Sequence, residues 1–154
     1  MGVKKTFRQA DHPLRVLQVE DAATDAELIL RELKRHKLSF ESKRVWTEAD
    51  FIAALSTFVP DIILSDNSMP RFDGLQALKI SRELAPGTPF IFVSGSIRPE
   101  DAEIALKSGA LAYLVKDDVT RLVATMRKAV ENTKTPSITP ASNGMSPKSA
   151  KPES

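Results

Sequence analysis

The feature that most constrains the fold is an alternation of short apolar runs with stretches of helical periodicity. Runs of four to six apolar residues that are separated in this way are typical of buried parallel strands. A parallel sheet with helices on both faces is therefore the predicted architecture. The predicted strands cover about 15–19, 42–46, 61–65, 90–94 and 112–115.

Helix start and stop signals lie between the predicted strands. Thr24 and Glu27 have the spacing of a capping box, which predicts that the first helix begins near Thr24. Thr47, with Asp50 three residues later, predicts the start of the second helix. Pro60 predicts the end of the second helix, and a third helix is predicted over 75–84, ending at Pro86-Gly87. A fourth helix is predicted from Pro99 to a stop at Gly109, and the last helix begins at Asp118 or Thr120.

Five strands alternating with five helices leave few topologies, because crossover connections are right-handed. The common arrangement at this size is a flavodoxin-like, doubly wound sheet with the strand order 2-1-3-4-5. That α/β fold is the prediction for this chain. It places the first and third strands side by side, at the point where the strand order reverses and ligands usually bind.

Composition excludes several classes of function. The chain has 154 residues, which suits one domain, and it contains no cysteine, which excludes disulfides, thiolate metal sites and a cysteine nucleophile. No apolar stretch is long enough to cross a membrane, and no signal peptide opens the chain, so a cytoplasmic protein is expected.

Positive charge is concentrated at the two ends of the chain. The net charge is +2, but the first thirteen residues and the segment after Glu131 each carry +2, so the part between them carries −2. Direct nucleic-acid binding is therefore not expected. We predict a flexible leader over 1–13, one domain over 14–132, and a disordered tail or linker over 133–154, where prolines are scattered among Ser, Thr, Ala and Lys.

Polar side chains follow four of the predicted strands. Glu20-Asp21 follows the first, Asp66 the third, Ser94 the fourth and Lys116 the fifth. Because the carboxyl ends of parallel strands lie at one edge of a sheet, these side chains are expected to meet there. In isolation, each has an ordinary interpretation as a turn or surface residue; together, their alignment on four strand ends indicates a site.

The residue types at this edge suit phosphoryl chemistry with a divalent metal. Three crowded carboxylates repel one another unless a cation lies among them, and Mg²⁺ prefers carboxylate and phosphoryl oxygens. An aspartate can also act as a nucleophile and accept a phosphoryl group. Lys116 would neutralise charge on that group, and the hydroxyl of Ser94 could donate a hydrogen bond to it.

The ordered set Glu20-Asp21, Asp66, Ser94 and Lys116 resembles the receiver domain of two-component response regulators. Shorter matches support the resemblance, which covers about 14–132: Met69-Pro70, Asp73-Gly74, Ser108-Gly109-Ala110, and Tyr113 three residues before the lysine. The phrases Pro89 to Gly95 and Lys116-Asp117-Asp118 are similar to a branch found beside sensor kinases and in stand-alone receivers.

The resemblance implies a role for each matched residue. It implies that Asp66 is the phospho-acceptor, charged by a sensor histidine kinase or a histidine phosphotransfer protein. It implies a Mg²⁺ site at Glu20, Asp21, Asp66 and the backbone carbonyl of Ser68. It implies that Ser94 and Tyr113 form the switch, that Lys116 pairs with the phosphate, and that the fourth helix, fifth strand and fifth helix form the face that binds a downstream target, or a second copy in a homodimer.

Two positions depart from the pattern of the family. Asp117 stands where the family usually has a proline after the lysine, so a cis peptide bond is not expected there. Ser68 occupies a position that varies in the family. It also stands where a Mg²⁺-dependent phosphatase of the haloacid dehalogenase type carries its second acid, which disfavours that enzyme. Two further functions compete with a phosphorylatable receiver: a degenerate receiver that only docks a protein, and an FMN carrier.

Overall fold

The computed structural model describes residues 13–67 and 69–134. The predicted leader and tail therefore lie almost entirely outside the described residues. The described residues divide into two compact units, one of which is Pro13–Met126; the residues 127–134 belong to the other. The fold and the site are described within Pro13–Met126.

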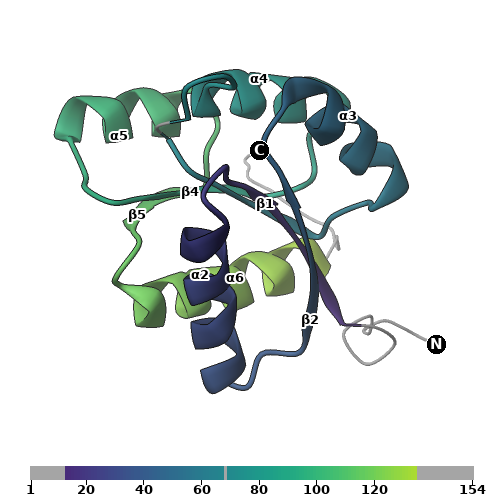
Figure 1. Cartoon of the computed structure of the whole chain (residues 1–154), viewed down its shortest axis with the longest axis vertical. Helices are drawn as coiled ribbons and strands as arrows, with labels where there is room; N and C mark the ends of the chain where they lie inside the picture. Colours follow the sequence, from purple (N-terminus) through teal and green to yellow (C-terminus); the bar gives the residue numbers. More distant parts are fainter. Residues whose placement is uncertain (1–12, 68, 135–154) are drawn as a thin grey trace, which may run out of the picture. The chain divides into compact units, whose positions relative to one another are not determined.

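The sheet has five parallel strands. Their bounds are β1 Leu14–Val19, β2 Phe40–Val45, β3 Ile62–Ser65, β4 Phe90–Ser94 and β5 Ala112–Val115. The strand order is β2-β1-β3-β4-β5, and every neighbouring pair is parallel. The predicted doubly wound, flavodoxin-like topology is confirmed, with β1 and β3 adjacent at the centre (Figure 1).

The described part of the chain contains five helices. Their bounds are α2 Ala23–Arg35, α3 Glu48–Thr57, α4 Gly74–Leu84, α5 Pro99–Lys107 and α6 Val119–Lys134. Helices α3, α4 and α5 lie on one face of the sheet, and α2 and the start of α6 lie on the other (Figure 1). None of the helices in this part of the chain is long and apolar enough to cross a membrane.

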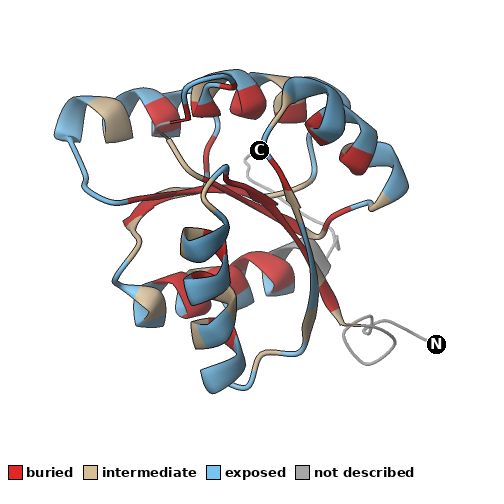
Figure 2. Cartoon of the chain, viewed as in Figure 1, coloured by how far each residue is buried: buried red, intermediate tan, exposed pale blue. Residues whose placement is uncertain are grey.

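Burial follows the position of each strand in the sheet (Figure 2). All residues of β3 and β4 are buried, because helices cover both faces of these central strands. The edge strand β2 is mostly exposed and carries Glu41 and Lys43, charges that discourage pairing with a further strand.

Aromatic rings form much of the core on the side of α3, α4 and α5. The ring centroids of Phe51 and Phe72 are 5.6 Å apart, and those of Phe90 and Phe92 are 5.1 Å apart. The ring of Tyr113 stacks on Phe92 at 5.4 Å. Fully burying a phenylalanine contributes about 1.5–3 kcal/mol, so this cluster is a major source of the stability of the domain.

Helix capping differs from the sequence prediction at one helix. Thr47 caps α3 as predicted, since its side chain accepts a hydrogen bond from the backbone N–H of Asp50. The predicted capping box at Thr24 is wrong, because α2 already begins at Ala23 and Thr24 lies inside its first turn. Asp118 precedes α6 and accepts a hydrogen bond from the backbone N–H of Arg121. Helix α6 continues to Lys134, two residues past the predicted boundary at 132.

Candidate functional site

The hydrogen-bonding ladders of the sheet extend into the candidate site. The backbone N–H of Asp66 donates to the carbonyl of Val19 at 2.9 Å, and the N–H of Lys116 donates to the carbonyl of Ser94 at 2.7 Å. The N–H of Glu20 donates to the last residue of β2 at 2.9 Å. Each residue that follows a strand is thus held at the same edge of the sheet, as the sequence predicted.

Three carboxylates gather at this edge. Glu20, Asp21 and Asp66 each offer an oxygen, and these oxygens all lie within 4.8 Å of one another. Glu20 is buried, Asp66 is half-buried and Asp21 is exposed, so the cluster opens to solvent on one side. A set of hard oxygen donors with an open side fits Mg²⁺, which keeps several waters when it binds to proteins.

Glu20 is the most enclosed of the three acids. Burial raises the pKa of its carboxyl, although hydrogen bonds from Lys116 and from the backbone N–H of Ala22 oppose that shift. The ammonium of Lys116 lies 2.9 Å from one oxygen of Glu20, and the N–H of Ala22 lies 3.1 Å from the other. A cation beside Glu20 favours its charged form.

Lys116 lies among the acids but is not closest to Asp66. Its Nζ is 2.7 Å from Asp25 Oδ2 and 3.9 Å from Asp66 Oδ1. Burial alone would lower the pKa of Lys116, but the hydrogen bonds to Asp25 and Glu20, together with the negative charges of Asp66 and Glu20, outweigh burial and raise the pKa. The lysine is therefore a firmly charged group in a carboxylate-rich site.

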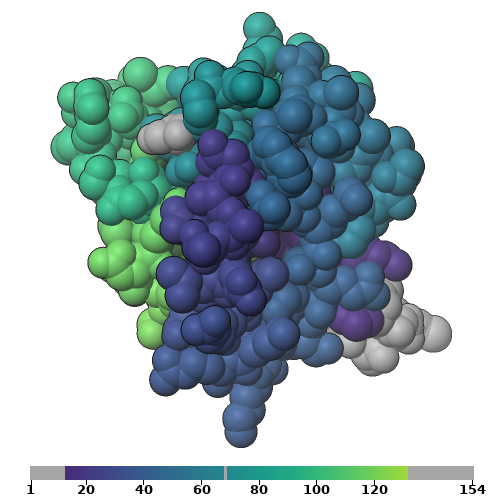
Figure 3. Space-filling model, in the orientation of Figure 1, coloured from purple at the N-terminus to yellow at the C-terminus, as the bar shows by residue number. Residues whose placement is uncertain are grey.

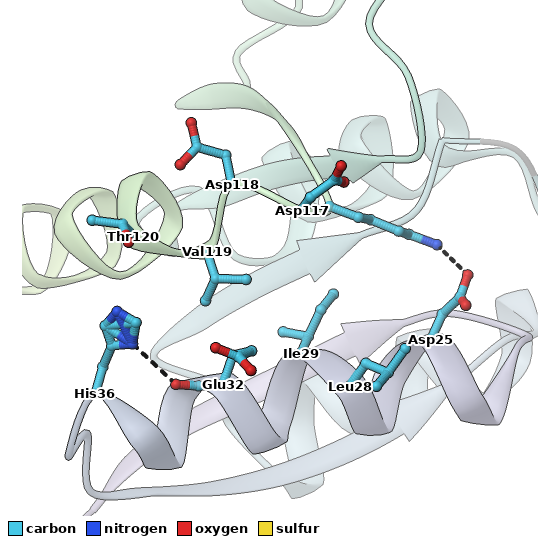
Figure 4. Close-up of a pocket in the computed structure, with 10 residues that line it drawn as sticks. Asp25, Leu28, Ile29, Glu32, His36, Asp117, Asp118, Val119 and Thr120 are labelled. Atoms are coloured by element: carbon cyan, nitrogen blue, oxygen red, sulfur yellow. Dashed lines mark hydrogen bonds and ion pairs between the residues drawn. The ribbon is translucent and has the colours of Figure 1, made fainter.

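Asp25 is a member of the site that sequence analysis missed. It lies in the first turn of α2, and the dashed line at Asp25 in Figure 4 marks its contact with Lys116. Both residues line a cavity of about 470 Å³ between α2 and the start of α6, with Ile29 and Val119 among its apolar walls. The only sequence signal for Asp25 is an acid at a helix N-terminus, which is ordinary there.

Ser94 and Tyr113 lie on neighbouring strands beside the acids. Ser94 ends β4 and is buried, and Tyr113 is buried with its ring against Phe92. The Tyr113 hydroxyl accepts a hydrogen bond of 2.9 Å from the side-chain amide of Asn67, the residue after Asp66. Asn67 is a second residue that sequence analysis missed, since a polar residue in a loop carries little signal.

The loop that carries Asp66 packs tightly against the start of α4. A Cβ atom on Gly74 would lie 2.6 Å from Cε1 of Phe92 and 2.8 Å from the carbonyl oxygen of Asp66. Only a residue without a side chain allows this approach. Ser68, whose carbonyl the resemblance places at the metal, lies outside the described residues.

Arg44 supports the backbone that carries the acids. Its guanidinium donates to the carbonyls of Glu20 at 3.1 Å and of Asp21 at 3.5 Å. The same group lies over the ring of Trp46 at 4.4 Å from the centroid. Because Trp46 is the only tryptophan in the chain, its fluorescence is a natural reporter of this site.

The peptide bond after Lys116 is trans, as expected from Asp117 in place of a proline; the described residues contain no cis peptide bond. Asp117 and Asp118 are exposed and lie between Lys116 and the start of α6.

Comparison with known proteins agrees with the geometry. The family model for the response regulator receiver domain matches residues 16–127. The chain therefore belongs to the response regulator receiver domain family, a signalling family whose members act with sensor histidine kinases and bind Mg²⁺ through acidic residues.

Relatives with similar sequences include transcriptional regulators. The chain is 38% identical over 95 residues to the transcriptional regulatory protein ZraR of Escherichia coli, an alignment that covers 58% of this chain and 22% of the relative. It is 37% identical over 82 residues to the DNA-binding transcriptional regulator NtrC of Proteus hauseri, and this alignment covers 53% of this chain and 17% of the relative. The chain thus spans only about a fifth of these relatives.

Solved structures show the same fold. The receiver domain of Francisella response regulator 1452 aligns with a TM-score of 0.69 and 26% identity, covering 79% of this chain and 99% of that one. A CheY-like receiver domain protein from Methanospirillum hungatei aligns with a TM-score of 0.68 and 22% identity, and the alignment covers 79% of this chain and 96% of that one.

Proposed function

We propose that this chain is a phosphorylatable receiver of a two-component or phosphorelay system, working in the cytoplasm. Asp66 would accept a phosphoryl group from a phosphohistidine of a sensor histidine kinase or a histidine phosphotransfer protein. The observation that carries the proposal is the convergence of Asp66 with two further acids, within 4.8 Å, and with Lys116, 3.9 Å from Asp66.

The chemistry follows from these positions. An oxygen of the Asp66 carboxylate forms a bond to phosphorus while the N–P bond of the phosphohistidine breaks, and the electron pair of that bond stays on the imidazole. Transfers of this kind depend on positioning and charge neutralisation. Lys116 supplies one positive charge, and the hydroxyl of Ser94 can donate a hydrogen bond to a phosphoryl oxygen.

Glu20, Asp21 and Asp66 would hold the Mg²⁺ ion, with the backbone carbonyl of Ser68 as a further ligand. When bound, Mg²⁺ supplies charge neutralisation for the phosphoryl oxygens. The fit rests on the donor set, which consists of oxygens only, and on the burial of Glu20, whose charged form a cation stabilises.

The signal would leave through the face formed by α5, β5 and the start of α6. Ser94 and Tyr113 link the acceptor to this face, because Ser94 ends β4 and Tyr113 lies in β5. Helix α5 and the segment before β5 carry large apolar side chains that are about half exposed: Ile104, Leu106 and Leu111. Exposed apolar residues of this kind suit a protein partner, either a downstream target or a second copy of the chain.

The test uses beryllofluoride, which mimics a phosphoryl group on aspartate, and acetyl phosphate as a phosphoryl donor. With Mg²⁺, beryllofluoride should bind the wild type and change the fluorescence of Trp46, and acetyl phosphate should add the mass of one phosphoryl group. Asp66→Asn should abolish both results, and Asp50→Asn, an exposed acid on α3, should leave both unchanged. A wild type that neither binds beryllofluoride nor gains mass would refute the proposal.

Partner binding separates this function from a receiver that only docks a protein. A phosphotransfer screen against candidate kinases should label the wild type at Asp66. Tight binding of a partner that is indifferent to Asp66→Ala, with no labelling, would favour the docking module instead.

A further inference from the structure

The ion pairs of Lys116 are ranked by distance. Its Nζ lies 2.7 Å from Asp25 Oδ2 and 2.9 Å from Glu20 Oε1, both within hydrogen-bond distance. Asp66 Oδ1 lies at 3.9 Å, beyond that distance. The lysine that should pair with a phosphoryl group on Asp66 is therefore engaged by two other acids.

The two acids differ in how readily they can release the lysine. The side chain of Glu20 is 6% exposed, whereas that of Asp25 is 43% exposed. Water can replace Lys116 at Asp25, because an exposed carboxylate is readily solvated. Water cannot easily do so at Glu20, because leaving a buried charge unpaired is costly. Asp25 is thus the partner from which Lys116 can move most easily.

A lysine ammonium has three N–H donors, so it can hold Glu20 and a phosphoryl oxygen at the same time. No other acid is placed to take over from Asp25: among the described residues, the ion pairs of Lys116 are those with Glu20, Asp25 and Asp66. The other acids that line the adjoining cavity include Glu32, which pairs with Arg35, and Asp118, which pairs with Arg121.

We propose that Asp25 is a positioning residue that competes with the phosphorylated acceptor for Lys116. In the unmodified protein, Asp25 draws the ammonium away from Asp66. When Asp66 carries a phosphoryl group, Lys116 leaves Asp25, keeps Glu20 and pairs with a phosphoryl oxygen. Asp25 therefore lowers the stability of the phosphorylated state. This inference rests on the proposed function, because it assumes that Asp66 is the acceptor.

Asp25 is also accessible for such an exchange. It lies on α2, whose residues form part of the front surface in the space-filling view, beside the green surface of the start of α6 (Figure 3). The cavity that Asp25 and Lys116 line gives both side chains room to move without disturbing the core.

The experiment measures the affinity of beryllofluoride, in the presence of Mg²⁺, by the fluorescence of Trp46 or by calorimetry. Asp25→Asn should tighten binding about two- to fivefold, the range that a half-exposed ion pair supports. Asp25→Glu, which keeps the charge, should remain within about twofold of the wild type. Glu27→Gln removes one negative charge from the exposed side of the same helix, and it should have no comparable effect.

A double-mutant cycle separates positioning from general electrostatics. If Asp25 acted only as a nearby negative charge, its removal would favour an anionic ligand with or without the lysine. In a Lys116→Ala background, Asp25→Asn should no longer change the affinity, because no ammonium is left to compete for. A tightening that persists in that background would overturn the proposal, since Asp25 would then act only as a nearby charge.

A second measurement needs neither metal nor analogue. The NMR signal of the Lys116 ε-methylene, assigned by its loss in Lys116→Ala, should shift on Asp25→Asn and not on Glu27→Gln. This inference is refuted if the wild type binds beryllofluoride but Asp25→Asn changes neither the affinity nor the lysine signal. The proposed function would then still stand. A wild type that does not bind beryllofluoride refutes both.

Discussion

Replacing Gly74 by alanine is expected to destabilise the domain and to disturb the loop that carries Asp66. Gly74 is the first residue of α4, and it packs directly under that loop. The added Cβ would lie 2.6 Å from Cε1 of Phe92, 2.8 Å from the carbonyl oxygen of Asp66 and 3.3 Å from Cα of Asn67. Carbon atoms in contact are normally about 3.5–4.0 Å apart, so something must move.

The neighbours of Gly74 have little freedom to move. Phe92 is fully buried, and its ring contacts both Phe90 and Tyr113. The other two contacts are backbone atoms of the acceptor loop. Overpacking of this kind costs about 1–3 kcal/mol. Alanine offsets up to about 1 kcal/mol of this cost, because it loses less backbone entropy on folding than glycine does. The free energy of unfolding should therefore fall by about 1–2 kcal/mol.

Urea and thermal unfolding of the full chain measure this change. For a domain of this size, each kcal/mol corresponds to about 4 °C in the melting temperature, so Gly74→Ala should melt about 4–8 °C lower. Beryllofluoride should also bind more weakly, because the clash pushes on the backbone of Asp66. Gly87→Ala is the matched control, since a Cβ at Gly87 would meet nothing within 4 Å.

The packing argument is refuted if Gly74→Ala, Gly87→Ala and the wild type all unfold at the same urea concentration. The close approach seen in the structure would then not exist in solution. If Gly74→Ala loses stability but binds beryllofluoride as tightly as the wild type, the packing argument still holds. That result would show that the clash does not displace Asp66.

Two further substitutions test single contacts. Tyr113→Phe removes the hydroxyl that accepts from Asn67 but keeps the ring on Phe92, so the free energy of unfolding in urea should fall by about 0.5–1.5 kcal/mol; no loss would show that this hydrogen bond adds nothing. Thr47→Ala removes the cap of α3 and should cost about 1 kcal/mol, whereas Thr47→Ser, which keeps the hydroxyl, should cost much less. Equal losses in the two Thr47 variants would contradict the capping role.

The sequence predicted the position of the site because strand ends are local features. A run of apolar residues followed by a charged one marks where a buried strand leaves the sheet, and a parallel sheet brings such ends to one edge. Glu20, Asp66, Ser94 and Lys116 could therefore be placed together from the sequence. The chain order of strands and helices, with right-handed crossovers, led to the order 2-1-3-4-5 in the same way.

The start of α2 shows where local patterns were insufficient. The spacing of Thr24 and Glu27 suits a capping box, yet the helix begins one residue before Thr24. The side chain of Glu20 instead accepts from the N–H of Ala22, at the residue that precedes the helix. A residue of the site thus takes part in starting this helix, and no local spacing rule includes such a contact.

The sequence by itself determined the parallel sheet, its strand order, and the group of acids, hydroxyl and lysine at one edge, because hydrophobic periodicity and chain connectivity are written along the chain. Only the tertiary structure decided that Lys116 pairs with Asp25 and Glu20 in preference to Asp66, and that Asn67 holds the hydroxyl of Tyr113. These choices depend on distances of a few ångströms between side chains that are far apart in sequence, and such distances are set by packing.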